Sequence, residues 1–464
     1  MGKKISDKRA MAILLFTVVF FFLGILVVKA NTTVMLISAG SVTICLAMFS
    51  GVKWEELNDD ICQNISIFIP GILVIMAVGM LIGAWVISGT IPLMIFYGLK
   101  MLSPSWFLVT TLLICIVISI TTGTSWGTIG TVGVALMGVS GGLGIPLPYT
   151  AGAIVSGAIF GDKLSPLSDS TILASAVSNV YIYDHMKYML LTTIPSMVFA
   201  LVLYWFLGRG ASGIIEGEQL NTILTTIEKN FSLNPVLILP PVTVLLLVTM
   251  QKPALPTFAA GIFTAAILAV IVQDVSLKDV SNVIYSGYNK TTDVEIVDKM
   301  ILRGGLKSML GTAAIPLAAA IFGAPLKTIG VIDILVRFVR ETAKTGKVFQ
   351  LGMFFVHSFL YLITGSYYVT FSVFGPSVRS LYNEFGLHRA NLSRLLEDTG
   401  TAFAPVIPWS VTGAFCAGTL NVPTFDYIIY APITYGAQIC LLLCIVFDFR
   451  IAGKDDEITK QGVR

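Results

Sequence analysis

The chain has 464 residues, of which 55% are apolar and only 12% are charged, and its formal net charge is +3. This charged share is about half that of an ordinary soluble domain, so a water-soluble fold could not cover the apolar surface. The basic residues occur in short patches between apolar segments rather than in one stripe, which excludes nucleic acid as the expected partner. The expected environment is a lipid bilayer.

Residues 1–62 carry two apolar stretches, 11–28 and 32–50, followed by a charged connector. A transmembrane helix needs about 20 mostly apolar residues, so we expect both stretches to cross the membrane. Basic residues precede the first span and follow the last one: Lys3, Lys4, Lys8, Arg9, Arg450, Lys454, Lys460 and Arg464. The positive-inside rule then predicts a multi-pass protein of the cell (inner) membrane with both termini in the cytoplasm and residues 450–464 as a cytoplasmic tail.

Two dense apolar blocks, 63–210 and 304–449, are interrupted by Gly and Pro, and we interpret them as two transport repeats. Residues 211–303 are expected to form polar loops around two linking helices, 234–251 and 254–273. Backbone groups freed by helix breaks are tolerated at membrane depth only where they are buried in protein or line a polar cavity. We therefore predict an all-α integral membrane protein with broken helices, re-entrant hairpins and roughly 11 to 13 membrane segments.

The two blocks resemble each other in sequence. Residues 122–128 (TGTSWGT) of the first block correspond to 364–370 (TGSYYVT) of the second, and each is followed by a segment containing acids and prolines, 161–171 and 397–408. Paired interrupted segments in two halves are typical of a secondary transporter built from inverted repeats, with its site at their interface. One half can then move against the other and expose the site to each side in turn.

Three acids inside the apolar blocks are the leading candidates for ion binding: Asp162, Asp169 and Asp398. A carboxylate at membrane depth costs at least a few kcal/mol unless it is paired, hydrated or bound to a cation. Carboxylate and hydroxyl oxygens are the ligands of a hard cation, so we predict a transported sodium ion at these acids. The neighbouring hydroxyl ligands would be Thr124, Ser125, Ser165, Ser168, Ser366 and Thr399. Asp162 and Asp169 would form the main site, with Asp398 lining the same cavity from the other half.

A buried carboxylate also explains exchange, because sodium and a proton compete for the same negatively charged group. Two structural interpretations stay open beside this one. Lys163 could form an ion pair with Asp162 or Asp169 at a helix end facing water, and the Ser and Thr hydroxyls could bond back to their own helices.

The run 161–169 (GDKLSPLSD), preceded by 123–128 (GTSWGT), resembles the NhaC family of sodium/proton antiporters, and 397–401 (EDTGT) is similar to its second-half motif. The resemblance covers most of the chain. It implies membership of the ion transporter superfamily, with inverted repeats, re-entrant hairpins and a transport domain that moves against a scaffold. Ser366, Tyr367 and Tyr368 stand where the first block has Thr, Ser and Trp, so the second half departs from the pattern of the first.

The predicted function is secondary active exchange of sodium ions for protons. No Walker A loop, HExxH or GxGxxG motif is present, so neither an enzyme nor an organic cofactor is expected, and the ion gradient supplies the energy. The alternative is a sodium- and proton-coupled organic acid exchanger of the malate/lactate type, for which Lys163, Arg379 and Arg394 are the candidate cationic groups. A passive channel or a membrane receptor fits less well. Expected partners are small inorganic cations and lipid, with an organic anion and a homodimer left open.

Overall fold

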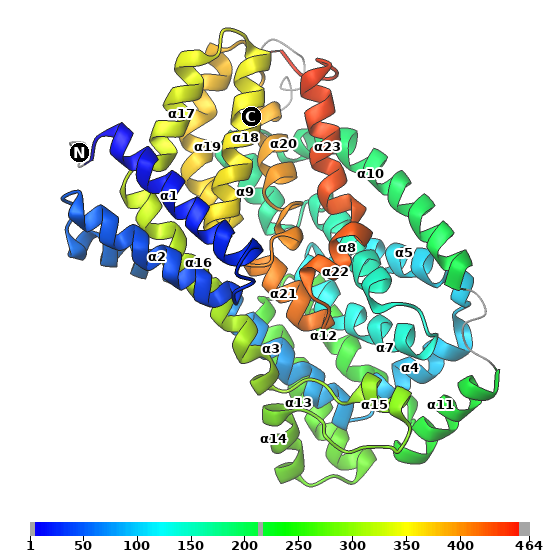
Figure 1. The fold of residues 1–464 in the computed structure, drawn as a ribbon. Helices are drawn as coiled ribbons and strands as arrows, with labels where there is room; N and C mark the ends of the chain where they lie inside the picture. Colours follow the sequence, from blue (N-terminus) through cyan, green and yellow to red (C-terminus); the bar gives the residue numbers. More distant parts are fainter. Residues whose placement is uncertain (1–4, 212–216, 454–464) are drawn as a thin grey trace.

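The computed structural model describes residues 5–211 and 217–453, and within these ranges the protein consists of helices without β-strands (Figure 1). Nine helices of this described part are long and apolar enough to cross a membrane, or up to 11 if each of two bent helix pairs is one span. The all-α membrane fold is therefore confirmed. The orientation prediction rests partly on Lys3, Lys4, Lys454, Lys460 and Arg464, which lie outside the described residues.

The outer surface carries large apolar side chains that water would not tolerate. Phe49 is 90% exposed, Ile271 73% and Phe206 62%, and these residues come from three well-separated helices. Large apolar side chains are also exposed on most of the other long helices, and the hydrocarbon of a bilayer solvates such a surface. The exposed surface therefore faces lipid.

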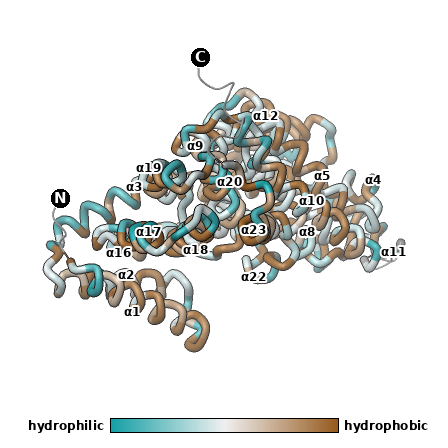
Figure 2. Tube along the Cα trace, turned by 90° about the horizontal axis from the view of Figure 1, so that it is seen from above, coloured by the Kyte–Doolittle hydropathy of each residue, from teal (hydrophilic) through white to brown (hydrophobic). Residues whose placement is uncertain are grey.

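Helices α1 (Asp7–Leu26) and α2 (Thr32–Phe49) confirm the two leading spans. They pack on each other, and the hydroxyl of Thr43 donates to that of Thr17 at 3.0 Å between them. Figure 2 shows the pair as a mostly hydrophobic unit at one side of the molecule. They contact the remainder through α16 (Leu306–Thr328), through α17 (Val331–Thr342) and through Phe21, which packs edge-on against Trp409.

The remaining long helices form two series that follow each other in the chain. The first series comprises α3 (Trp54–Ile87), α4 (Thr90–Met101), α5 (Pro104–Thr122), α6 (Ser125–Thr128), the π-helical turn η1 (Ile129–Gly133), α7 (Val134–Gly142), α8 (Leu147–Lys163), α9 (Asp169–Ser178) and α10 (Ile182–Ala211). The second series comprises α16 (Leu306–Thr328), α17 (Val331–Thr342), α18 (Gly346–Thr364), α19 (Tyr367–Glu384), α20 (Ala390–Thr399), η3 (Ala404–Val406), α21 (Val411–Leu420), α22 (Thr424–Tyr427), η4 (Ile428–Tyr430) and α23 (Pro432–Val446).

The two series repeat each other in helix length and in the residues that end the helices. α4 and α17 both have 12 residues, α5 and α18 both have 19, and α9 and α21 both have 10. Gly123 ends α5 at φ 69° and Gly365 ends α18 at φ 65°, a left-handed conformation that glycine adopts without steric cost. Asn179 and Asn421 end α9 and α21 at the same φ of 55°. The predicted correspondence of the two blocks therefore extends well beyond the motifs.

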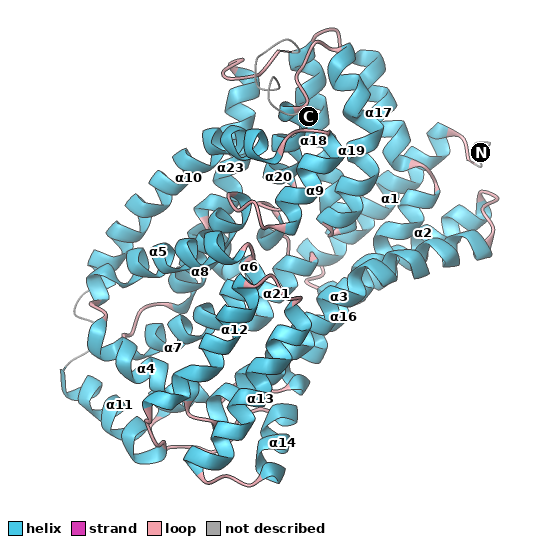
Figure 3. Ribbon diagram, turned by 180° about the vertical axis from the view of Figure 1, so that it is seen from behind, coloured by secondary structure: helices cyan, strands magenta, loops and turns pink. Residues whose placement is uncertain are grey.

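The repeats are inverted, as the packing of their first helices shows. Lys327 at the end of α16 bonds to Asp60 near the start of α3 at 3.3 Å, while the N–H of Gly305, just before α16, donates to the carbonyl of Gly79 near the end of α3 at 2.7 Å. α3 and α16 are thus antiparallel neighbours, side by side in Figure 3. Because each begins its series, the two series enter the membrane from opposite directions.

The segment between the series is more helical than expected. The predicted linking helices appear as α12 (Leu239–Thr249), preceded by η2 (Pro235–Ile238), and α13 (Ala254–Gln273). The polar stretches around them were predicted as loops, and this is wrong over α11 (Gly217–Asn230), α14 (Leu277–Ser286) and α15 (Glu295–Ile301). In α11 the fully buried Ile223 and Ile227 share one face that packs on α4 and α15. Polar residues on the other face lower the mean hydropathy and conceal this amphipathic pattern.

Gly157 sets the close approach of α8 to α5, as its small-xxx-small spacing with Gly161 indicates. A Cβ at Gly157 would lie 2.6 Å from the carbonyl oxygen of Leu112 and 2.7 Å from Cβ of Cys115. We expect Gly157→Ala to lower stability by about 1 to 3 kcal/mol, because the helices must separate. Gly311→Ala, at a helical glycine with no atom within 4 Å of the added Cβ, is the matched control and should leave stability unchanged or slightly higher. Thermal unfolding in detergent measures both, and equal effects would contradict the close-packing interpretation.

Candidate functional site

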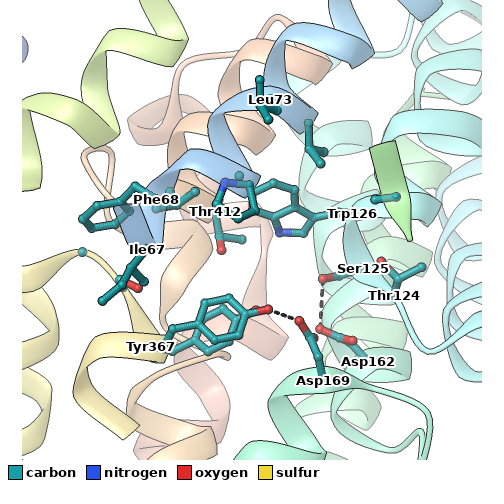
Figure 4. Close-up of a pocket in the computed structure, with 18 of the residues that line it drawn as sticks. Ile67, Phe68, Leu73, Thr124, Ser125, Trp126, Asp162, Asp169, Tyr367 and Thr412 are labelled. Carbon is teal, nitrogen blue, oxygen red and sulfur yellow. Dashed lines mark hydrogen bonds between the residues drawn. The ribbon is translucent and has the colours of Figure 1, made fainter. Parts of the chain in front are cut away.

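A pocket of about 650 Å³ lies where the two series meet (Figure 4). Each series contributes a turn and a helix break to its wall: the turn after α5 and the break after α8 from the first, the turn after α18 and the start of α21 from the second. The polar residues lining it are Thr124, Ser125, Asp162, Asp169, Ser366 and Thr412. Its aromatic residues are Phe68, Trp126, Tyr361, Tyr367 and Tyr368.

The chain is irregular at these places for local reasons. Left-handed glycines end α5 and α18, and the next residues, Thr124 and Ser366, are extended and begin the following helix. α8 ends at Lys163 shortly before Pro166, which has no N–H to donate and disfavours a helical conformation in the residue before it. The turns therefore place hydroxyl side chains, and the break places acids, against one cavity.

Asp162 is the buried acid of the pocket. Its side chain is only 5% exposed, and its Oδ2 accepts a hydrogen bond of 3.0 Å from the hydroxyl of Ser125. Its other oxygen, Oδ1, has no hydrogen-bond partner of normal geometry, although the hydroxyl of Ser168 lies close to the carboxylate. A buried carboxylate oxygen without a partner is unfavourable unless a cation or a proton satisfies it. The geometry therefore leaves one oxygen of Asp162 free to bind a cation.

Asp169 is more exposed and begins α9. Its Oδ1 accepts a 2.9 Å bond from its neighbour, the N–H of Ser170, and its Oδ2 accepts a bond from the hydroxyl of Tyr368. Tyr368 belongs to the second series, so this bond connects the two series across the pocket. Asp169 also lies close enough to Asp162 for the two negative charges to repel each other, and a cation between them would relieve that repulsion.

The predicted site residues divide into two groups. Thr124, Ser125, Asp162, Asp169 and Ser366 line the pocket. Ser165, Ser168, Asp398 and Thr399 lie outside its lining and make other bonds. The Ser165 hydroxyl donates to the carbonyl of Ile120 at 2.8 Å, and the hydroxyls of Ser168 and Ser170 are hydrogen-bonded at 3.1 Å. Asp398 is paired with Lys163 at 2.6 Å. The Thr399 hydroxyl is hydrogen-bonded to His357 at 2.6 Å.

Lys163 pairs with Asp398, not with either first-series acid. Both partners are completely buried, and they join the last residue of α8 to α20 of the second series. The structural alternative of an ion pair within the first series is therefore wrong, because the break after α8 directs the lysine towards α20. Arg394 is buried too, and its guanidinium carbon lies 4.2 Å from the centroid of the Tyr188 ring. Both basic residues stand outside the pocket lining.

Three features of the site escaped the sequence argument. The hydroxyl of Tyr368 binds Asp169. The ring of Trp126 stacks on that of Phe415 beside the cavity, with 4.3 Å between the ring centroids. Glu397 is fully buried next to Asp398. The position of Glu397 in an apolar block was a usable signal, since it is an acid adjacent to a predicted ion ligand. Within the described residues, no three His, Cys, Asp or Glu side chains cluster as ligands of a metal ion.

The model of the Na+/H+ antiporter family matches residues 8–177 and 157–449, which together span most of the chain. The chain belongs to the Na+/H+ antiporter family. The resemblance of its motifs to the NhaC antiporters is confirmed, because it is 35% identical to the Na(+)/H(+) antiporter NhaC of Alkalihalophilus pseudofirmus over 87% of this chain and 88% of that one.

Two further relatives of the chain carry other names. The chain is 36% identical to the malate-2H(+)/Na(+)-lactate antiporter of Bacillus subtilis, over 88% of this chain and 87% of the relative. It is 33% identical to the arginine/ornithine antiporter ArcD of Halobacterium salinarum, over 95% and 92%. Because these relatives are named for different transported species, the pocket's own residues must guide the choice of substrate.

Proposed function

We propose that this protein is a secondary active transporter that exchanges sodium ions for protons across the cell membrane. The observation that carries the proposal is the charge of the pocket. Asp162 and Asp169 line it, and no Lys, Arg or His is among the residues that the structure describes there. Two carboxylates with hydroxyl groups around them suit a hard monovalent cation, which prefers oxygen ligands.

Exchange follows from competition at these carboxylates. Sodium neutralises the repulsion between Asp162 and Asp169 when it binds, and a proton does so when sodium leaves. The pocket lies between inverted series, so moving one series against the other opens it to alternate sides. Proton import would then drive sodium export, without an organic cofactor and without catalysis of a chemical reaction.

The experiment that tests this function measures the pH inside liposomes that contain the purified protein. Adding sodium chloride outside should move protons out of the liposomes, while potassium chloride should move few or none. Protein-free liposomes are the control. Proton movement that needs no sodium, or flux of sodium without any proton movement, would overturn the proposal, and the second result would indicate a channel.

The second candidate is the organic acid exchanger, favoured by the likeness to the malate-2H(+)/Na(+)-lactate antiporter. A free organic anion would meet two carboxylates and no basic side chain in the pocket, since Lys163 and Arg394 lie outside its lining. Arg379 is also absent from the lining. The organic anion would therefore need sodium ions as its counter-charge. Proton movement that occurs only with sodium malate or lactate, and not with sodium chloride, would replace our proposal with this one.

The cellular setting completes the proposal. The protein spans the cell (inner) membrane several times with both termini in the cytoplasm, and small inorganic cations are its transported partners. We keep residues 63–210 and 304–449 as the two transport repeats, 211–303 as the segment that links them and 450–464 as the tail. A homodimer is the proposed oligomeric state to examine first, by crosslinking in membranes.

A further inference from the structure

Glu397 is a fully buried acid that the exchange mechanism above does not use. It lies in α20, where every residue from Ala390 to Thr399 is buried. Both of its carboxylate oxygens lack a hydrogen-bond partner of normal geometry. An isolated carboxylate in such surroundings is strongly unfavourable, because burial removes the water that would stabilise its charge. Glu397 therefore needs a proton or a cation.

The cation that acts electrostatically on Glu397 is already engaged. Lys163 interacts electrostatically with Glu397, but its ammonium group is bonded to Asp398 at 2.6 Å. Other charged and titratable groups lie on α20 and on the helices that pack against it, and neither carboxylate oxygen of Glu397 has a normal hydrogen bond to any of them. They include Arg394 on α20, Asp169 on α9, His185 and Tyr188 on α10, His357 on α18, Tyr367 and Tyr382 on α19, and Cys440 and Cys444 on α23.

Glu397 is also coupled to the pocket. The charges of Glu397 and Asp162 repel each other, although the residues come from different series. The serine pair Ser168 and Ser170, whose hydroxyls are 3.1 Å apart, lies between them: Ser168 adjoins Asp162 and Ser170 adjoins Glu397. Each hydroxyl can accept one proton and pass on its own. This pair therefore offers a route between the buried acid and the cavity.

We propose that Glu397 holds the transported proton, while sodium binds at Asp162 and Asp169, so that the two ions occupy separate but electrostatically coupled sites. The inference rests on the proposed sodium/proton exchange and revises one step of it, because the proton is held by Glu397 instead of by the carboxylates of the pocket. With the pocket empty, the negative charge of Asp162 favours a proton on Glu397. Sodium binding cancels that charge, and the proton leaves. Competition thus arises without a shared ligand.

The variant that tests this is Glu397→Gln, which keeps the shape of the side chain but holds no exchangeable charge. Two fluxes are measured in liposomes: proton movement driven by a sodium gradient, and exchange of radioactive sodium for unlabelled sodium at equal pH on both sides. We expect Glu397→Gln to lose the proton movement and to keep the sodium-for-sodium exchange. Glu397→Asp, which keeps a carboxylate, should regain part of the proton movement.

Glu384→Gln is the matched control, because Glu384 lies on the surface at the end of α19, paired with Arg340. It should leave both fluxes unchanged. Proton movement at the wild-type level in Glu397→Gln would overturn the separate proton site while leaving the exchange function intact. Loss of both fluxes in a variant that remains monodisperse would also overturn it, since Glu397 would then serve sodium binding. If the wild type itself shows no sodium-driven proton movement, the proposed function fails instead.

Discussion

Replacing Asp162 by Asn should abolish sodium-driven proton movement. The carboxylate presents one oxygen to Ser125 and one free oxygen to the pocket, and an amide offers a cation no charge at either position. Losing a charged ligand of this kind costs on the order of 1.5 to 3 kcal/mol, a fall in sodium affinity of roughly 10- to 150-fold. Sodium-dependent thermal stabilisation of the purified protein measures the affinity, and the liposome assay measures the exchange.

Asp60→Asn is the control for this prediction. Asp60 is also an acid within a membrane helix series, but it pairs with Lys327 where α3 meets α16 and does not line the pocket. Its replacement should leave sodium affinity unchanged. Retention of wild-type exchange by Asp162→Asn would remove the pocket from the transport mechanism, whatever happens at Asp60.

Local sequence patterns were enough to predict the long apolar helices and the repeat. A long apolar run forms a helix in lipid because its backbone groups must bond internally, so α1, α2 and α13 follow from hydropathy. The glycine turns at Gly123 and Gly365 could be aligned because their conformation restricts the residue type. Amphipathic α11 was missed because its apolar residues are dispersed at helical spacing among polar ones.

Contacts between distant residues were beyond the sequence argument. Lys163 and Asp398 are 235 positions apart, and nothing in either motif indicates which acid the lysine will meet. The same holds for Tyr368 and Asp169, which come together only because the inverted series bring the turn of one to the break of the other. Residue types thus identified Asp162 and Asp169 as candidates, whereas the distinction between a pocket acid and an ion-paired acid needed the three-dimensional arrangement.

The Lys163–Asp398 pair should contribute strongly to the stability of the contact between the two series. Both side chains are completely buried, so Lys163→Met leaves Asp398 charged and without its partner. Breaking a buried pair in this way costs about 3 to 5 kcal/mol, whereas removing both charges is often close to neutral. We therefore expect Lys163→Met to lower the unfolding temperature strongly and Lys163→Met with Asp398→Asn to restore most of it, measured by thermal unfolding in detergent.

The two single variants should also differ from each other. In Asp398→Asn, the freed lysine still has Glu397 nearby as a second carboxylate, so part of the loss is recovered. Lys163→Met leaves Asp398 only the electrostatic attraction of Arg394, which forms no ion pair with it in the described residues. Lys163→Met should therefore be the less stable of the two. Additive losses in the double variant would contradict the pairing, since independent sites add whereas paired ones do not. If the double variant also exchanges sodium for protons, Asp398 serves to hold the two series together and the sodium ligands are those of the pocket.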